Sequence, residues 1–295
     1  MITQPTKLSI SNGQLKVTQD EEWNIPLEDI SSIVLESPQI SMSAKLMGML
    51  AEYKIIVYSC NDKHLPNGIF IPFAKHCREL KVIKGQLNCT ESFNKRCWQK
   101  IIKQKVKNQA KVLQFVYNTD DYKVIENMAE NINSGDTKNI EAIAAKEYFK
   151  ILFGYGFSRN YDNIYNASLN YGYSIIRGAI ARAIVSYGYM PAVGIHHKSE
   201  LNNYNLVDDF IEPFRGVVDL WVKNNINDEM EFDKQIRAGL VNLLNVDVKI
   251  QGKMQSVNNA INIMVASYTS AINDKYNYKK LELPELVPIK DHTYE

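Results

Sequence analysis

The sequence predicts an α+β protein in which a small N-terminal β-sandwich-like domain precedes a large all-α domain. Two observations support this fold class. Residues 1–74 contain short alternating or β-branched segments separated by turn signals, which is typical of a small sandwich. From about residue 75 the apolar residues recur at helical spacing instead. We therefore expect a β domain over residues 1–74, a connector over 75–89 and a helical domain over 90–295.

Individual elements follow from turn residues and periodicity. Asn12-Gly13 separates two alternating segments, which is the strongest short signal for a hairpin. NGIFIPF predicts a strand that follows a turn at Asn67-Gly68. The two prolines of residues 281–295 predict a loose tail. Helices are expected over residues 90–116, 120–132, 137–153, 162–187, 205–222, 229–245 and 255–274.

Composition narrows the class of protein. The chain has 295 residues, 45% of them hydrophobic, which is enough for two domains. Its net charge of +1 gives no overall sign of a nucleic-acid partner. We find no signal peptide and no apolar run of membrane-spanning length, so we expect a cytoplasmic protein without a membrane role. The cysteines form no C-x-x-C pair and are expected to be reduced thiols: Cys60, Cys77, Cys89 and Cys97.

One glutamate stands out in the helix expected over residues 137–153. Glu147 is spaced four residues from both Ile143 and Ile151, which places it on the apolar stripe of that helix. An acid on an apolar face is costly unless it is paired or bound to metal. The alternative is a glutamate at the edge of the core that pairs with an arginine.

A second cluster lies in GIHHKSELNNYNLVDDFIEPFR, residues 194–215. Helical spacing would place Glu212 on one side with either Asp208 or Asp209. Paired carboxylates suit hard divalent cations, and a nearby imidazole adds tolerance of Mn²⁺. Adjacent His196 and His197 diverge in most backbone conformations, so one is expected to be a ligand and the other a structural neighbour. The alternative is a loop with two solvated histidines and a helix with an acidic outer face.

Pro213 interrupts this expected helix. Its ring clashes with the carbonyl group of Asp209 four residues back, so we expect a kink there or a helix that begins near Glu212. The sequence leaves open which acid faces the histidine.

Basic residues concentrate just before and within the helix expected over 90–116. Residues 75–111 contain 11 Lys or Arg and only two acids. This imbalance indicates contact with a phosphate backbone, whereas ordinary solvated helices alternate charges. A later segment, residues 157–191, is rich in Tyr and Asn and carries Arg159, Arg177 and Arg182, which could hold phosphates or stack on bases. Tyr173 and Tyr187 are expected in the core instead.

Three motifs, taken together, are specific enough to indicate a protein family. NASLNYGYSIIRG, GIHH and DDFIEPFR closely resemble the CRISPR adaptation integrases, which insert new spacers into CRISPR arrays. The form EPFR resembles members of the single-effector, type II systems. The resemblance covers nearly the whole chain. It implies the metal ligands Glu147, His197 and Glu212. It leaves His196 open as an alternative to His197, and Asp209 open as a further ligand or as the alternative to Glu212.

The resemblance also implies an activity. It implies a metal-dependent DNA endonuclease and integrase that uses Mg²⁺ or Mn²⁺ to join 3′-hydroxyl ends of captured double-stranded DNA to a CRISPR repeat. The helical domain would be catalytic and the β domain would form a homodimer. A small companion adaptation protein, and possibly other type II CRISPR proteins, would be partners. The alternatives are a repair-type nuclease and a non-catalytic DNA-binding scaffold. Expected DNA contacts are Lys95, Arg96, Lys100, Lys103, Lys107, Arg159 and Arg177.

Overall fold

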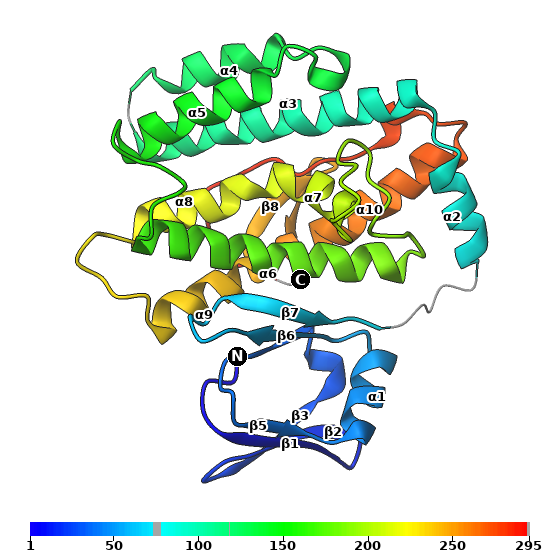
Figure 1. Ribbon diagram of the computed structural model, residues 1–295, viewed down its shortest axis with the longest axis vertical. Helices are drawn as coiled ribbons and strands as arrows, with labels where there is room; N and C mark the ends of the chain where they lie inside the picture. The colour runs from blue at the N-terminus through cyan, green and yellow to red at the C-terminus, as the bar shows by residue number, and fades with distance from the viewer. Residues whose placement is uncertain (73–77, 118, 294–295) are drawn as a thin grey trace.

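The computed structural model describes residues 1–72, 78–117 and 119–293, and within them strands come first and helices follow. Figure 1 shows the N-terminal strands at one end of the molecule and most of the helices stacked above them. The expected boundary between residues 74 and 75 lies outside the described residues, so this domain division stays a prediction. The mixed α+β class itself is confirmed.

The N-terminal unit contains two sheets and one helix. The first sheet has the order β3-β2-β1-β5, with β1 Thr6–Ser11, β2 Gln14–Thr18, β3 Glu22–Pro26 and β5 Ile40–Met42. The second has the order β4-β6-β7, with β4 Ser32–Leu35, β6 Ile56–Cys60 and β7 Pro66–Phe70. A separate core joins both sheets to α1, Ala44–Glu52. Its members include Leu8, Val17, Ile33, Leu46 and Val57.

One turn prediction is confirmed and the other is wrong. Asn12 and Gly13 have positive φ and join antiparallel β1 and β2. Asn-Gly is favoured in two-residue hairpin turns because both central residues take positive φ. Asn67 and Gly68 instead lie inside β7. The turn is made earlier, where the Asn61 side chain accepts hydrogen bonds from two backbone N–H groups and His64 takes a positive φ.

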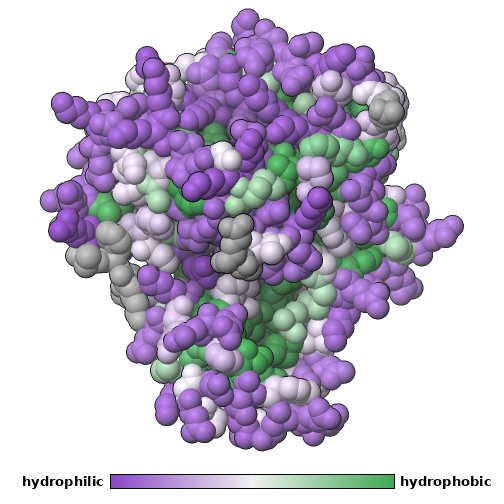
Figure 2. Space-filling view, turned by 180° about the vertical axis from the view of Figure 1, so that it is seen from behind, coloured by the Kyte–Doolittle hydropathy of each residue, from purple (hydrophilic) through white to green (hydrophobic). Residues whose placement is uncertain are grey.

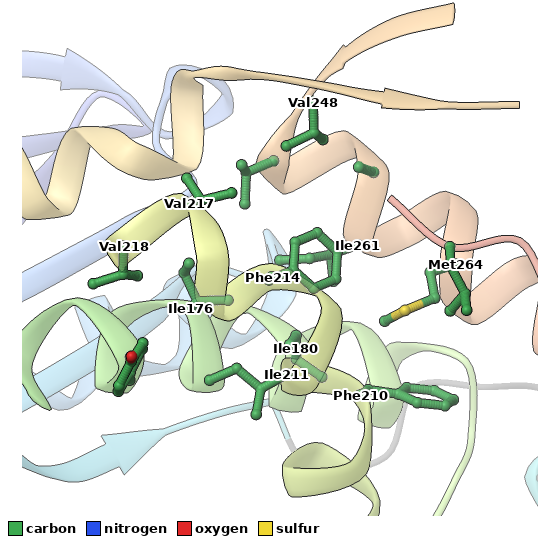
Figure 3. Packing of buried hydrophobic residues seen from close by; sticks show 14 of the residues in the cluster. Ile176, Ile180, Phe210, Ile211, Phe214, Val217, Val218, Val248, Ile261 and Met264 are labelled. Atoms are coloured by element: carbon green, nitrogen blue, oxygen red, sulfur yellow. The ribbon is translucent and has the colours of Figure 1, made fainter. Parts of the chain in front are cut away.

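The helical part is built around α6, Ile164–Ser186, and α3, Glu91–Val116. The other helices are α2 Glu79–Leu87, α4 Tyr122–Glu130, α5 Ile140–Phe153, α7 Asn205–Ile211, α8 Arg215–Asn225, α9 Lys234–Asn242 and α10 Val257–Asn273, with short 3₁₀ turns such as η3 Glu212–Phe214. The expected break at Pro213 is confirmed, because η3 separates α7 from α8. Figure 3 shows the apolar residues of this break packed with α6: Ile211, Phe214, Ile176 and Ile180.

Two expectations for the C-terminal part are wrong. The helical part is not purely α, because β8 Asp247–Ile250 and β9 Lys253–Ser256 form an antiparallel hairpin before α10. The last described residues are not a loose tail, since Leu281, Leu283 and Leu286 are buried. Asn108 of α3 fixes this segment by donating to the Pro284 carbonyl oxygen and accepting from the Leu286 N–H group.

The surface differs between the two ends of the molecule. Seen from behind, hydrophilic side chains cover most of the helical part, and apolar side chains gather in the lower part (Figure 2). The edge strand β3 contributes two large exposed apolar residues, Trp23 and Ile25. An exposed edge strand with apolar side chains is a surface that favours pairing with another chain.

Candidate active site

The loop before α7 folds tightly over a buried aspartate. A side chain at Gly194 would place its Cβ 2.3 Å from the His197 carbonyl oxygen, so only glycine fits there. Asp209 is completely buried and accepts hydrogen bonds from the backbone N–H groups of Ile195, His196 and His197, at 2.5, 3.0 and 3.1 Å. Both carboxylate oxygens are therefore occupied by the loop.

Asp209 also orients one histidine ring. Its Oδ1 lies 2.7 Å from His197 Nδ1, and this hydrogen bond raises the pKa of His197. A carboxylate at Nδ1 favours a proton on that nitrogen, which leaves Nε2 as the atom available to a ligand. With four accepted bonds, Asp209 acts as the residue that positions His197, and its oxygens have little capacity left for a metal.

The two adjacent histidines have different surroundings. The His196 ring stacks on Trp98, with ring centroids 4.1 Å apart and planes inclined by 2°. Burial lowers the pKa of His196. The His197 ring lines a cavity that also contains Glu212 and Arg215. This geometry favours His197 over His196 as the functional ring.

Glu212 is the acid that shares this cavity. It is 6% exposed at the break between α7 and α8, and Arg215 contacts its Oε1 through Nε and Nη2, both at 3.0 Å. Burial raises the pKa of Glu212, but Arg215 and Lys105 outweigh it and lower the pKa to about 2. Its second oxygen, Oε2, lies 2.5 Å from Lys105 Nζ, yet it accepts no hydrogen bond of good geometry. Glu212 is thus a buried carboxylate whose two oxygens face the guanidinium group of Arg215 and the ammonium group of Lys105.

A glutamate missed in the sequence completes this cluster. Glu141 of α5 accepts a hydrogen bond from Lys105, and it lines a second hollow of about 290 Å³ together with Glu212 and Arg215. The hollow that contains His197 measures about 430 Å³, and the two share Tyr173, Glu212 and Arg215. The spacing of Glu141 from the buried Ala144 and Tyr148 was the signal that could have revealed it.

The expected position of Glu147 is wrong. Ile143, placed on the apolar stripe, is 52% exposed, and Glu147 is half-buried and pairs with Lys150 at 3.2 Å. The buried face of α5 runs through Ala144, Tyr148 and Leu152. The structure therefore places Glu212 in one cavity with His197 and in another with Glu141, and Glu147 lines neither of the two.

The lysines of α3 are largely engaged within the molecule. Lys95 pairs with Glu91, Lys103 and Lys107 pair with Glu130, and Lys100 donates to backbone carbonyl groups of residues 279 and 281. Arg96 lies over the Tyr278 ring. Most of the acids that balance this helix come from other elements, which is why the local sequence looked one-sided. The expected contact of this helix with a phosphate backbone stays a prediction.

Two of the three arginines of the tyrosine-rich segment, Arg177 and Arg159, border the cavities. Arg177 lines the larger cavity and forms a two-pronged ion pair with Asp208, at 2.6 and 3.0 Å. Arg159 lines the smaller one and donates to two asparagine side chains. Tyr173 is buried as expected, and its ring separates Arg159 from Arg215 at 5.6 and 4.7 Å from the centroid.

The acids and the histidine form a donor set for a hard divalent cation. Across residues 1–72, 78–117 and 119–293, no three His, Cys, Asp or Glu side chains lie close enough together to hold a metal ion as they stand. Lys105 Nζ instead contacts both Glu141 and Glu212. The Oε2 atom of Glu212, a second carboxylate on the same ammonium group and an imidazole that lines one cavity of Glu212 are donor types that suit Mg²⁺ or Mn²⁺.

Comparison with known proteins identifies the family. A family model described as CRISPR associated protein Cas1 matches residues 1–242. The CRISPR-associated endonuclease Cas1 of Neisseria meningitidis serogroup C (strain 8013) is 41% identical over 293 residues, 98% of this chain and 96% of that protein. The strands and helices described above are therefore those of a CRISPR-associated protein. The chain belongs to the Cas1 family.

Solved structures support the same fold. A casposase bound to integration product has a TM-score of 0.74 at 20% identity, and the match covers 92% of this chain and 89% of that one. A Cas6-RT-Cas1–Cas2 complex has a TM-score of 0.73 at 17% identity, covering 97% of this chain and 36% of that one. Within the described part of the chain, no helix is long and apolar enough to cross a membrane.

Proposed function

We propose that this chain is a CRISPR spacer-acquisition integrase, which joins 3′-hydroxyl ends of captured DNA to the CRISPR repeat in a metal-dependent reaction. Membership of the Cas1 family supports a role in a CRISPR system. The observation that carries the proposal is the pair of carboxylates, Glu212 and Glu141, that meet on one ammonium group beside the cavity that His197 lines. Two carboxylates brought together in this way suit a divalent cation.

The residues have distinct roles in this proposal. Glu212, His197 through Nε2, and Glu141 hold the cation. Asp209 fixes the His197 ring and Arg215 fixes Glu212. Mg²⁺ or Mn²⁺, when bound, supplies polarisation of the phosphoryl group and neutralises the charge of the departing oxygen.

The reaction is a transesterification in which the protein provides no nucleophile. The 3′-oxygen of the captured fragment forms a new bond to a phosphorus atom at the repeat border, and the bond from that phosphorus to the 3′-oxygen of the flanking strand breaks. The departing 3′-oxygen takes up a proton, which balances the proton lost by the attacking hydroxyl group. Arg177 and Arg159 border the cavities and are placed to contact phosphate groups. Water in place of the 3′-hydroxyl group would give nuclease activity.

The same proposal includes partners. The exposed apolar edge of β3 supports a homodimer through a sandwich-like β domain. The matched Cas6-RT-Cas1–Cas2 complex supports assembly with a small companion protein, and type II partners follow from the resemblance of EPFR. Integration at both ends of a repeat requires two active sites at a fixed separation, which one copy of the chain does not provide.

A DNA-joining assay tests the function. The chain, with and without the companion protein, is incubated with a short duplex bearing 3′-hydroxyl ends and a supercoiled plasmid that carries a CRISPR repeat, in Mg²⁺ or Mn²⁺. We expect covalent joining at repeat borders that is lost in Glu212→Gln and His197→Ala. Cleavage without joining would favour a repair-type nuclease. DNA binding without any metal-dependent product would favour a scaffold.

Two variants of α5 decide between the glutamates. Glu141→Gln and Glu147→Gln remove the same charge from the same helix, six residues apart. We expect Glu141→Gln to abolish joining and Glu147→Gln to retain it, because only Glu141 contacts the ammonium group that Glu212 shares. The reverse result would restore Glu147 as the ligand.

A further inference from the structure

Lys105 differs from the other lysines of α3. Its side chain is 9% exposed, and Nζ lies between the carboxylates of Glu141 and Glu212. Burial lowers the pKa of Lys105, but the charges of Glu212 and Glu141 outweigh this effect and raise it. The ammonium group therefore carries its charge at the centre of the candidate site.

The position of Nζ is one where a divalent cation would be favoured. Two carboxylates from different elements, α5 and the break before α8, meet on it, and Arg215 holds the far oxygen of Glu212. Without a cation between them, two buried carboxylates would repel each other and lose hydration. The ammonium group thus stabilises the arrangement that a metal would use.

The same helix offers Lys105 a second position. Gln109 follows Lys105 by four residues and so lies on the same face of α3. Gln109 is 2% exposed, its Oε1 accepts no hydrogen bond, and its side chain lines the hollow that Lys105, Glu141 and Glu212 line. A buried acceptor without a donor calls for an explanation, and a displaced ammonium group would supply that donor.

We propose that Lys105 is a built-in counter-ion of the metal site: it holds Glu141 and Glu212 together without metal, and a divalent cation displaces it toward Gln109 Oε1. This inference rests on the proposed function, since it assigns the same two carboxylates to metal. It makes Lys105 a positioning residue that competes with the metal. A purely structural ion pair would not change metal affinity.

Metal binding without DNA tests the competition. Mn²⁺ affinity is measured by calorimetry and by the electron paramagnetic resonance of free Mn²⁺ for wild type, Lys105→Met, Lys105→Gln and Lys111→Met. Lys111 is the matched control, because it lies on the same helix and pairs with Glu285 instead. We expect Mn²⁺ to bind roughly tenfold to hundredfold more tightly to both Lys105 variants, because the metal then relieves two unpaired buried acids. Lys111→Met should bind as wild type.

Thermal unfolding gives a second readout. The metal-free Lys105 variants should melt at a lower temperature than wild type and recover on addition of Mn²⁺ by a larger shift than wild type shows. Lys105→Gln is included in case Lys105→Met fails to fold, because the amide protons of glutamine can still donate hydrogen bonds to the carboxylates. Unchanged or weaker Mn²⁺ affinity in a folded Lys105 variant would overturn the proposal.

Wild-type protein provides an independent check. A crystal structure with Mn²⁺ should show Nζ withdrawn from Glu212 Oε2 and bonded to Gln109 Oε1, and Gln109→Leu should weaken Mn²⁺ binding. An ammonium group that stays between the carboxylates beside bound Mn²⁺ would refute displacement while leaving the proposed function intact. Mn²⁺ binding that Glu212→Gln does not weaken would instead remove the metal site, and the counter-ion role with it.

Discussion

Asp209 shows how one buried residue fixes a reactive ring. Three backbone N–H groups and His197 Nδ1 converge on its carboxylate. The same carboxylate therefore fixes both the backbone of residues 195–197 and the orientation of the His197 ring. Such outer partners of a ligating histidine contribute about 10- to 100-fold in metal affinity or activity. The doubled histidine is explained as well, because His196 stacks on Trp98 and only His197 faces the cavity.

We predict that Asp209→Asn lowers DNA joining by roughly 10- to 100-fold and lowers the pKa of His197. The reason is that the neutral amide no longer stabilises the charged imidazole that Asp209 now favours. An NMR titration of His197 measures the pKa, and the joining assay measures the activity. Asp208→Asn is the comparison, since Asp208 bonds Arg177 and Asn202 instead. Equal pKa changes in the two variants would contradict the assignment.

Asp219 gives a pH-dependent prediction. Burial raises its pKa to about 6, even though Tyr173 and Tyr148 donate hydrogen bonds to it. A carboxyl group whose pKa is raised by folding costs stability as pH rises from its ordinary value of about 3.9 through about 6. The two-unit difference corresponds to about 3 kcal/mol.

Asp219→Asn should remove this cost. Urea unfolding between pH 4 and pH 7 should show a wild-type free energy of unfolding that declines relative to the variant as pH rises. Glu212 does not interfere, because its lowered pKa makes its contribution fall only below about pH 4.5. Parallel curves for the two proteins would contradict the prediction.

The residues that form the candidate site were only partly predictable from the sequence. The motif GIHH and the acids of DDFIEPFR lie where the cavity forms, but the choice among them depends on which hydrogen bonds each makes in three dimensions. Glu147 was chosen because Ile143 and Ile151 suggested a stripe. In the structure, Ala144 and Tyr148 lie on the buried face of α5, whereas Ile143 is 52% exposed.

At the scale of elements, local signals were right at two positions and wrong at a third. Pro213 breaks its helix and Asn12-Gly13 makes its hairpin, whereas Asn67-Gly68 lies inside β7. The charge imbalance of α3 is smaller in the folded chain than in the local sequence, because most partners of its lysines, such as Glu130 and Glu285, are distant in sequence. The C-terminal segment was misjudged for the same reason, since Asn108 binds it across 176 or more residues.

The contact between α6 and β6 gives a prediction at this scale. A Cβ at Gly178 would lie 2.2 Å from the ring of Tyr58, whose hydroxyl group donates to the Ile175 carbonyl oxygen at 2.8 Å. Gly178→Ala should therefore destabilise the protein by about 1–3 kcal/mol through overpacking. Gly48→Ala in α1 is the control, because no atom lies within 4 Å and alanine favours the helix by about 0.5–1 kcal/mol. Chemical denaturation compares the two, and equal effects would argue against a close α6–β6 contact.

At the scale of the whole molecule, one buried ion pair joins the strands to the helices. Glu36 follows β4 and has a side chain that is 1% exposed. Arg237 of α9 donates to Glu36 Oε1 at 2.8 Å, and Tyr171 of α6 donates to the same atom at 3.0 Å. Since α6 also carries Tyr173 and Arg177, this joint relates the β unit to the element that borders the cavity.

We predict that Arg237→Met destabilises the protein by about 3–5 kcal/mol, because it leaves Glu36 charged, buried and without its cation. Glu36→Gln in the same chain should recover much of that loss, since a neutral amide needs no counter-charge and can still accept from Tyr171. A double-mutant cycle by urea unfolding measures the coupling free energy between Arg237 and Glu36. For residues in contact we expect about 0.5–3 kcal/mol. Additive effects would mean that this ion pair does not couple the strands to the helices. A strong coupling would mean that the orientation of the β unit, and with it the spacing of two sites in a homodimer, depends on this single charge pair.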